Sequence, residues 1–197
     1  MVIFVDFIIE NGGSNDSVGD QINIGIITVS DRAYKGEYLD EGGPKVIEFF
    51  SEIMDSEWTT YSIIIPDEKH KIEEAIIHLT DVFNCSLVVT TGGTGPAKRD
   101  VTPDATIAVG EKELPGFGEL MRAVSLKYVP TAILSRQTGV IRGNSLIINL
   151  PGQPRAIRET IDEVFLAIPY CIDLIDGPYI ETKKDAIKPF RPKNAQR

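Results

Sequence analysis

Four apolar runs along the chain have the length and composition of buried strands. Each is rich in isoleucine, valine or leucine, and each ends at a polar or glycine-rich segment. The runs cover residues 23–29, 58–65, 87–89 and 145–150. Short runs of this kind favour strands that are covered on both faces, as in a parallel sheet.

Apolar residues recur at helical spacing between these runs. Pro44 and Pro154 open two such segments, because the fixed φ of proline suits the first turn of a helix. Pro169 lies inside the last segment and should kink or split it. The predicted helices cover about residues 44–55, 68–84, 103–110, 117–127 and 154–175.

The alternation of strands and helices predicts an α/β fold, with three layers (α/β/α) around a mixed, mostly parallel sheet. The antiparallel part is predicted at residues 139–142 and 145–150. The turn Gly143-Asn144 separates these two segments, so they should form a hairpin.

The two ends of the chain differ from its middle. Residues 1–21 are interpreted as an N-terminal extension and linker, with a strand-like run at 2–9 and a polar, glycine-rich stretch at 10–21. Residues 22–178 are expected to form one domain. Residues 179–197 are a basic tail, whose charged side chains are expected to be solvated.

Charge and cysteine content narrow the functional class. A formal net charge of −9 argues against general binding of nucleic acid or of anionic membranes. No apolar run approaches the roughly 20 residues of a membrane span. Cys85 and Cys171 lie outside any C-x-x-C motif and border apolar segments. Both are expected to be buried and reduced, as in a cytoplasmic protein.

A glycine-rich loop follows the run at 87–89. It contains Gly92-Gly93-Thr94-Gly95, then Lys98, Arg99 and Asp100, and Thr102-Pro103 after it has the pattern of a helix N-cap. Glycines allow positive φ and let a ligand approach the backbone, so several N–H groups can point at one anion. Lysine and arginine suit phosphate oxygens, and a carboxylate suits a divalent metal.

This loop is neither a P-loop, which needs G-x-x-x-x-G-K-[ST], nor the dinucleotide fingerprint G-x-G-x-x-G. A plain glycine-rich turn with a surface aspartate is the alternative to a phosphate site.

Other polar residues follow the remaining predicted strands. They are Ser30-Asp31, Asp67 and residues 151–153. In an α/β sheet the carboxyl ends of parallel strands form the ligand-binding edge, so these residues are predicted to converge on the glycine loop. Taken alone, Asp67 is better explained as the N-cap of the helix that follows it.

Six short motifs occur between residues 22 and 178. They are T-V-S-D (28–31), I-P-D-E (65–68), T-T-G-G-T-G-P-A-K-R-D-V-T-P-D-A-T (90–106), L-P-G-F-G-E-L-M-R (114–122), S-R-Q-T-G-V-I-R-G (135–143) and I-I-N-L-P-G-Q-P (147–154). Together and in this order they resemble the MogA-type molybdopterin adenylyltransferases. That fold family includes the MoaB proteins and the G domains of gephyrin and plant Cnx proteins.

The resemblance implies a reaction in which ATP donates AMP to the terminal phosphate of molybdopterin, with Mg²⁺ present and pyrophosphate released. It also implies a homotrimer, and a partner that inserts molybdenum into the product. By the same resemblance, Asp100 is the metal-binding acid and Asp67 a second catalytic carboxylate. The nucleotide and phosphate side would be formed by Ser30, Asp31, Gly92, Gly93, Thr94 and Gly95. The molybdopterin side would be formed by Pro151, Gly152 and Gln153, with Arg136 and Arg142 as phosphate contacts.

Three alternatives stand beside this interpretation. A MoaB-like paralogue would keep the fold and bind the pterin without efficient adenylylation, although Asp67 and Asp100 argue against it. A non-catalytic trimeric scaffold is a second alternative, disfavoured because no long linker or second domain accompanies the module. An NAD-binding enzyme is a third, disfavoured by the missing fingerprint.

Overall fold

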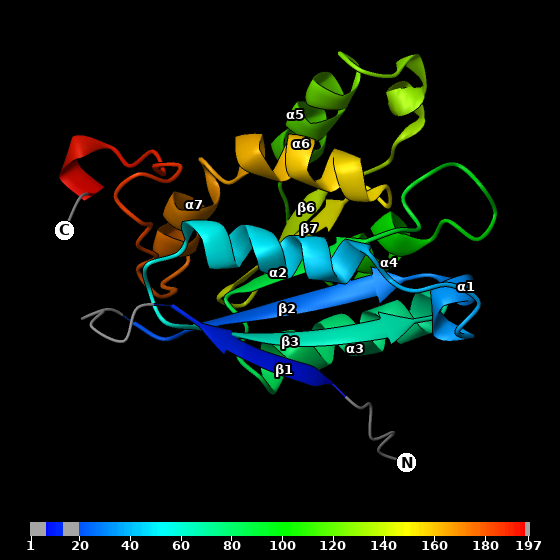
Figure 1. Cartoon of the computed structure of the whole chain (residues 1–197), viewed down its shortest axis with the longest axis horizontal. Helices are drawn as coiled ribbons and strands as arrows, with labels where there is room; N and C mark the ends of the chain where they lie inside the picture. The colour runs from blue at the N-terminus through cyan, green and yellow to red at the C-terminus, as the bar shows by residue number, and fades with distance from the viewer. Residues whose placement is uncertain (1–6, 14–19, 196–197) are drawn as a thin grey trace.

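The computed structural model describes residues 7–13 and 20–195, and seven strands within them form one sheet. The strands are β1 (Ile8–Gly12), β2 (Ile22–Val29), β3 (Trp58–Ile65), β4 (Leu87–Thr91), β5 (Lys112–Glu113), β6 (Gly139–Arg142) and β7 (Ser145–Leu150). Their order is β1-β3-β2-β4-β7-β6-β5 (Figure 1). The central strands β3, β2, β4 and β7 are parallel, and the outer strands pair antiparallel.

Helices cover both faces of this sheet. They are α1 (Asp31–Tyr34), α2 (Gly42–Ile53), α3 (Lys69–Asp81), α4 (Thr102–Val109), α5 (Pro115–Ser125), α6 (Pro154–Val164) and α7 (Ile168–Leu174). Helices α2, α5, α6 and α7 contribute to one buried apolar cluster, and α3 and α4 contribute to the other. The predicted three-layer α/β/α fold is therefore confirmed, and so is the hairpin, which β6 and β7 form.

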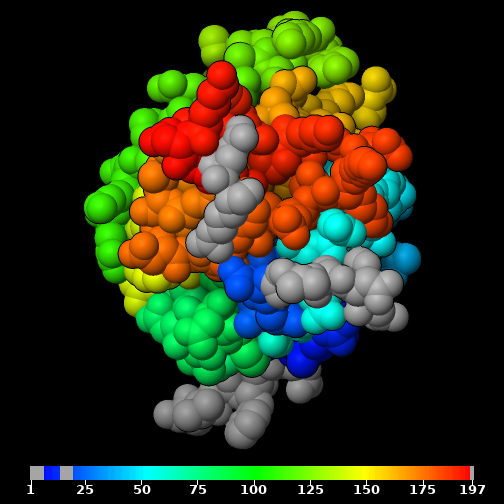
Figure 2. Space-filling model, turned by 90° about the vertical axis from the view of Figure 1, so that its left-hand side faces the viewer, coloured from blue at the N-terminus to red at the C-terminus, as the bar shows by residue number. Residues whose placement is uncertain are grey.

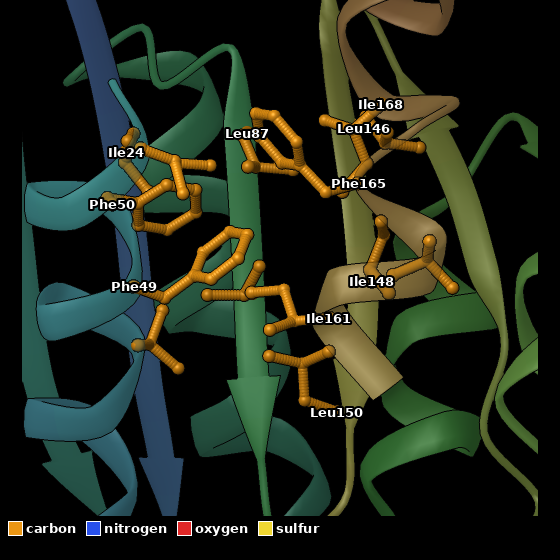
Figure 3. Packing of buried hydrophobic residues seen from close by; sticks show 14 of the residues in the cluster. Ile24, Phe49, Phe50, Leu87, Leu146, Ile148, Leu150, Ile161, Phe165 and Ile168 are labelled. Atoms are coloured by element: carbon orange, nitrogen blue, oxygen red, sulfur yellow. The ribbon is translucent and has the colours of Figure 1, made fainter. Parts of the chain in front are cut away.

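The larger cluster is built around three aromatic rings (Figure 3). Phe49 and Phe50 on α2 and Phe165 at the end of α6 are fully buried. The rings of Phe49 and Phe165 meet edge to face with their centroids 5.4 Å apart. Complete burial of one such side chain stabilises the fold by about 1.5–3 kcal/mol. This packing holds α2 and α6 on the sheet, where their first turns border the functional edge.

The long helix predicted at residues 154–175 is split, as expected. Helix α6 ends at Val164, and α7 begins at Ile168 with Pro169 in its first turn. Proline is tolerated there because its missing N–H would have no partner within the helix.

The N-terminal strand extends further than predicted. Residues 2–6 of the expected strand and 14–19 of the expected linker lie outside the described residues. Residues 10–12, predicted as linker, belong to β1, which pairs with β3 from Ile8–Ser62 to Gly12–Trp58. Glycine is required at position 12, since a Cβ there would lie 2.2 Å from the Trp58 ring.

The lysines of the basic tail are exposed, as predicted, but residues 181–195 also make specific contacts with the domain. Thr182 forms a β-bridge with Met54, and the Lys183 N–H donates to the Ile53 carbonyl at 2.8 Å. Arg191 forms a part-buried ion pair with Asp173 at 2.5 Å. Figure 2 shows this segment, in orange to red, packed over the end of the molecule beside α2. Ala186 and Ile187, which lie between the lysines, pack against the larger apolar cluster. The composition of the tail did not predict this packing.

The two cysteines are free thiols but differ in burial. Cys85 is completely buried, and burial raises the pKa of its thiol to about 12. Cys171 is only partly buried, so the expectation that both are buried holds for Cys85 alone. No helix in residues 7–13 and 20–195 is both long and apolar enough to cross a membrane.

Candidate active site

The carboxyl ends of β2, β3, β4 and β7 meet at one edge of the sheet and enclose an open cavity of about 560 Å³. This confirms the predicted convergence of strand ends. The residues that line the cavity are Val29, Ser30, Asp31, Arg32, Tyr38, Asp67, Gly92, Gly93, Thr94, Gly95, Asp100, Gly152 and Gln153.

The glycine loop can lie close to β2 only because Gly92 and Gly93 lack side chains. Gly92 and Gly93 have φ values of +96° and +64°. A Cβ on Gly92 would lie 2.3 Å from the Val29 carbonyl oxygen. Thr102 fixes the loop from below, because its hydroxyl donates to the Gly92 carbonyl at 2.9 Å and its N–H donates to the Gly93 carbonyl at 3.1 Å. Thr102 is therefore not the predicted N-cap, a position that Val101 takes.

Asp100 lines the cavity with one carboxylate oxygen uncommitted. Its Oδ2 accepts the Ala97 N–H at 2.9 Å, and its Oδ1 makes no hydrogen bond within the described part of the chain. Gly95 makes room for this carboxylate, since a Cβ at that position would lie 2.7 Å from Oδ2. The uncommitted oxygen is a hard ligand of the kind Mg²⁺ prefers.

Asp31 and Asp67 hold each other in place at the ends of β2 and β3. The Asp31 N–H donates to Asp67 Oδ2 at 2.7 Å, and the Asp67 N–H donates to Asp31 Oδ1 at 3.1 Å. The Arg99 guanidinium donates hydrogen bonds to both carboxylate oxygens of Asp31, at 2.6 Å and 2.8 Å. The N-cap interpretation of Asp67 is wrong, because Glu68 takes that position without a side-chain bond.

The two carboxylates of this pair are shifted in opposite directions. The hydrogen bonds from Arg99 hold the pKa of Asp31 below its ordinary value. Burial, followed by the negative charges of Asp31 and Asp100, raises the pKa of Asp67 above its ordinary value. A carboxylate with a raised pKa at the wall of a cavity is a candidate functional group.

The two arginines predicted to contact phosphate have other partners. Arg136 donates to both oxygens of Asp104, to the Gly95 carbonyl and to the Asp100 carbonyl, and so braces the loop from outside the cavity. Arg142 pairs with Asp81 at the end of α3, away from the cavity, so its predicted phosphate role is wrong. The structure gives Arg136 a positioning contact and does not place it among the lining residues.

The segment predicted for the molybdopterin side does reach the cavity. Gly152 and Gln153 line it, and the Pro151 carbonyl accepts the Thr91 hydroxyl at 2.8 Å. A Cβ on Gly152 would approach the Gly92 Cα to 3.2 Å, so the two loops are in close contact.

Sequence reasoning assigned no role to Tyr38 and Asp40 in the loop after α1. Asp40, one residue before the N-cap Glu41, accepts the N–H groups of Gly42 and Gly43 and the Thr28 hydroxyl, so it satisfies the first turn of α2 and anchors the loop. Tyr38 lines the cavity. An aspartate two residues before Gly-Gly-Pro is a capping signal that the sequence does contain.

The acids do not form a ready-made metal site. Among the described residues, no three histidine, cysteine or acidic side chains are grouped so that they could hold a metal ion. Asp31 is already paired through both oxygens. A Mg²⁺ ion held by Asp100 would therefore take its other ligands from water and from phosphate, which is its usual mode with nucleotide substrates.

A family model described as a probable molybdopterin binding domain matches residues 25–170, about three quarters of the chain. The chain belongs to this family. Three curated relatives of this chain are named molybdopterin adenylyltransferase. They come from Escherichia coli K12, Haemophilus influenzae and Helicobacter pylori. They are 50%, 53% and 56% identical, over 89%, 89% and 87% of this chain and 96%, 95% and 98% of their own lengths.

Solved structures in this family have the same fold. The molybdopterin biosynthesis enzyme MoaB from Thermus thermophilus superposes with a TM-score of 0.73 at 37% identity, covering 80% of this chain and 99% of that one. The molybdopterin biosynthesis Mog protein from Mycobacterium ulcerans superposes with a TM-score of 0.72 at 33% identity, covering 78% and 99%.

Proposed function

We propose that the protein is a molybdopterin adenylyltransferase of molybdenum cofactor biosynthesis, which transfers AMP from ATP to molybdopterin and releases pyrophosphate. The observation that carries the proposal is the cavity itself, where a glycine-rich loop lies with a pair of acids whose pKa values are shifted in opposite directions. The names of relatives that are at least 50% identical support it.

The chemistry needs charge neutralisation more than it needs a nucleophilic side chain. An oxygen of the molybdopterin phosphate attacks the α-phosphorus of ATP, the bond from that phosphorus to the bridging oxygen breaks, and pyrophosphate leaves with the electron pair. The backbone of residues 92–95 supplies donors for phosphate oxygens. Gly152 and Gln153 line the same cavity beside this loop, and we assign them to the second substrate. The product would pass to a molybdenum-inserting enzyme.

Mg²⁺ fits the proposed role of Asp100. When bound, it would neutralise charge on the nucleotide phosphates. Asp67, with its raised pKa and its backbone bond to Asp31, would orient the reacting groups rather than complete a protein metal cluster. The use of ATP and two free thiols also suit the cytoplasm.

The test is formation of adenylylated molybdopterin from ATP and Mg²⁺ by the wild type and by Asp100→Asn. The matched control is Asp81→Asn, which removes an exposed carboxylate away from the cavity. We expect Asp100→Asn to lose roughly 100-fold or more of the rate, as for removal of one charge-stabilising group. A folded wild type that binds molybdopterin but makes no product would instead identify a MoaB-like binding protein.

We also propose that the protein is a homotrimer. Large apolar side chains that are 41–70% exposed lie on helix α5, on the 3₁₀ helix η1 (Pro130–Leu134) and on the residues between them. An exposed apolar surface of this kind is typical of an association surface. The side chains are Leu120, Leu126, Tyr128, Val129, Ile133 and Leu134. Light scattering should give three times the 21.7 kDa chain mass, and Ile133→Glu should lower it. A monomeric wild type would contradict the proposal.

A further inference from the structure

We propose that Tyr38 is the stacking surface for a flat heteroaromatic ring of a substrate, and that it thereby helps to select the substrate. This inference rests on the proposed function, whose two substrates each carry such a ring. Among the described residues that line the cavity, Tyr38 is the only aromatic one. The other lining groups are mainly glycine backbone, carboxylates and small polar side chains, which bind phosphates rather than rings.

The fold does not need an aromatic side chain at this position. Tyr38 is 42% exposed and belongs to neither buried apolar cluster. A fold-stabilising tyrosine would be expected to bury its ring, since burial is the source of its packing energy. We therefore infer that the exposed ring of Tyr38 contacts a ligand in the cavity.

The ring is nevertheless held in a defined position. The Tyr38 hydroxyl donates to Ser30 Oγ at 3.1 Å, and the same Oγ accepts the Ala33 N–H at 3.3 Å as the N-cap of α1. Two residues further on, Asp40 anchors the chain to Thr28 at 2.8 Å. The loop is tied to the end of β2 on both sides of the ring, so stacking would cost little additional ordering.

A cation lies over one face of the Tyr38 ring, so a ligand ring would stack on the other face. The Arg32 guanidinium carbon lies 5.1 Å from the Tyr38 ring centroid, and Arg32 also lines the cavity. Within the described part of the chain, Arg32 forms no side-chain ion pair, unlike Arg99. An aromatic ring with a cation that forms no ion pair over its other face matches a ligand in which a flat ring is linked to phosphate. Both ATP and molybdopterin have this chemistry.

The experiment measures equilibrium binding of ATP, inorganic triphosphate and molybdopterin to the wild type, Tyr38→Leu and Tyr38→Phe. Tyr34→Leu is the matched control, because Tyr34 is 60% exposed at the end of α1, four residues before Tyr38, but does not line the cavity. Loss of base–aromatic stacking should weaken binding of the ring-bearing ligand roughly 5- to 150-fold. Inorganic triphosphate, which has no ring, should bind unchanged.

Each outcome is decisive. Selective weakening of ATP by Tyr38→Leu assigns the ring to adenine, and selective weakening of molybdopterin assigns it to the pterin. Tyr38→Phe, which keeps the ring, should bind far more tightly than Tyr38→Leu. The proposal is overturned if Tyr38→Leu binds both ligands like the wild type, if it loses triphosphate equally, or if Tyr38→Phe is as weak as Tyr38→Leu. Binding does not depend on turnover. A wild type that forms no product would therefore refute the proposed adenylyl transfer, and the binding data would still test the role of Tyr38.

Discussion

Substitution of Gly92 by alanine, which adds a single methyl group, tests whether close contact between the glycine loop and β2 shapes the cavity. In Gly92→Ala, the new Cβ would lie 2.3 Å from the Val29 carbonyl oxygen, where ordinary contact begins near 3.4 Å. Both atoms of this clash are attached to backbone, so no side-chain rotation relieves it. The loop must move from β2 by about 1 Å, and a displacement of that size costs about 100-fold in a positioned reaction.

The stability cost has two parts. Alanine at a φ of +96° is strained, and separating the loop from β2 weakens the two bonds that Thr102 makes to it. Together we expect a loss of about 2–4 kcal/mol in the free energy of unfolding. Urea denaturation measures this loss, and adenylyl transfer measured well below the denaturation midpoint gives the rate effect.

Gly143→Ala is the matched control for this variant. Gly143 also has a positive φ, +53°, but a Cβ there meets nothing within 4 Å, and the residue lies in the turn between β6 and β7. It should lose about 1 kcal/mol from backbone strain and keep its activity. If Gly92→Ala proved no worse than Gly143→Ala in both assays, close apposition of the loop and β2 would not be what shapes the cavity.

Three further predictions follow from charged groups. Asp67 has a raised pKa in the folded state, so its contribution to stability is fully present below about pH 3.8 and is lost as pH rises through the folded value. Asp67→Asn should therefore melt at a higher temperature than the wild type at pH 7 while losing activity, and an unchanged or lower melting temperature would contradict this sign. Asp31 has a lowered pKa, so its stabilisation is present above about pH 3.8 and is lost as pH falls through the folded value. Carboxyl NMR titration of Arg99→Gln should show the Asp31 pKa returning upward, and no change would rule out Arg99 as the cause. Arg191→Met should cost about 1.5–3 kcal/mol by removing the charged hydrogen-bond donor of the part-buried Asp173 carboxylate. Asp173→Leu combined with it should restore most of that loss, and denaturation of the single and double variants to the same extent would exclude the unpaired charge as the reason.

The layers of the fold followed from hydrophobic periodicity because each element has a strong pattern of its own. The strand at 58–65 and the split of the last long helix are local properties of the chain. The position of β1 was harder to predict from the sequence. Its pairing along the edge of β3 depends on Gly12 fitting over the Trp58 ring rather than on strand propensity. The contacts of the tail were not predicted because its charge outweighed the few apolar residues that pack, Ala186 and Ile187.

The candidate site was predictable as a set of strand ends but not as a set of contacts. Topology brings Asp31, Asp67 and Asp100 to one cavity, as alternating strands and helices require. Sequence could not show that Arg99 would pair with Asp31 instead of facing the ligand, since that choice depends on distances between loops. Nor could it single out Tyr38, which has no motif of its own and is distinguished only by being exposed at the cavity.

The most direct test of the central claim follows the label of ATP radiolabelled at the α-phosphate in a reaction with molybdopterin and Mg²⁺. The account predicts that the label appears on molybdopterin and that one pyrophosphate is released for each labelled molecule. Label that remains in ATP, or that is released as free AMP with molybdopterin unmodified, would contradict adenylyl transfer as the function of this cavity.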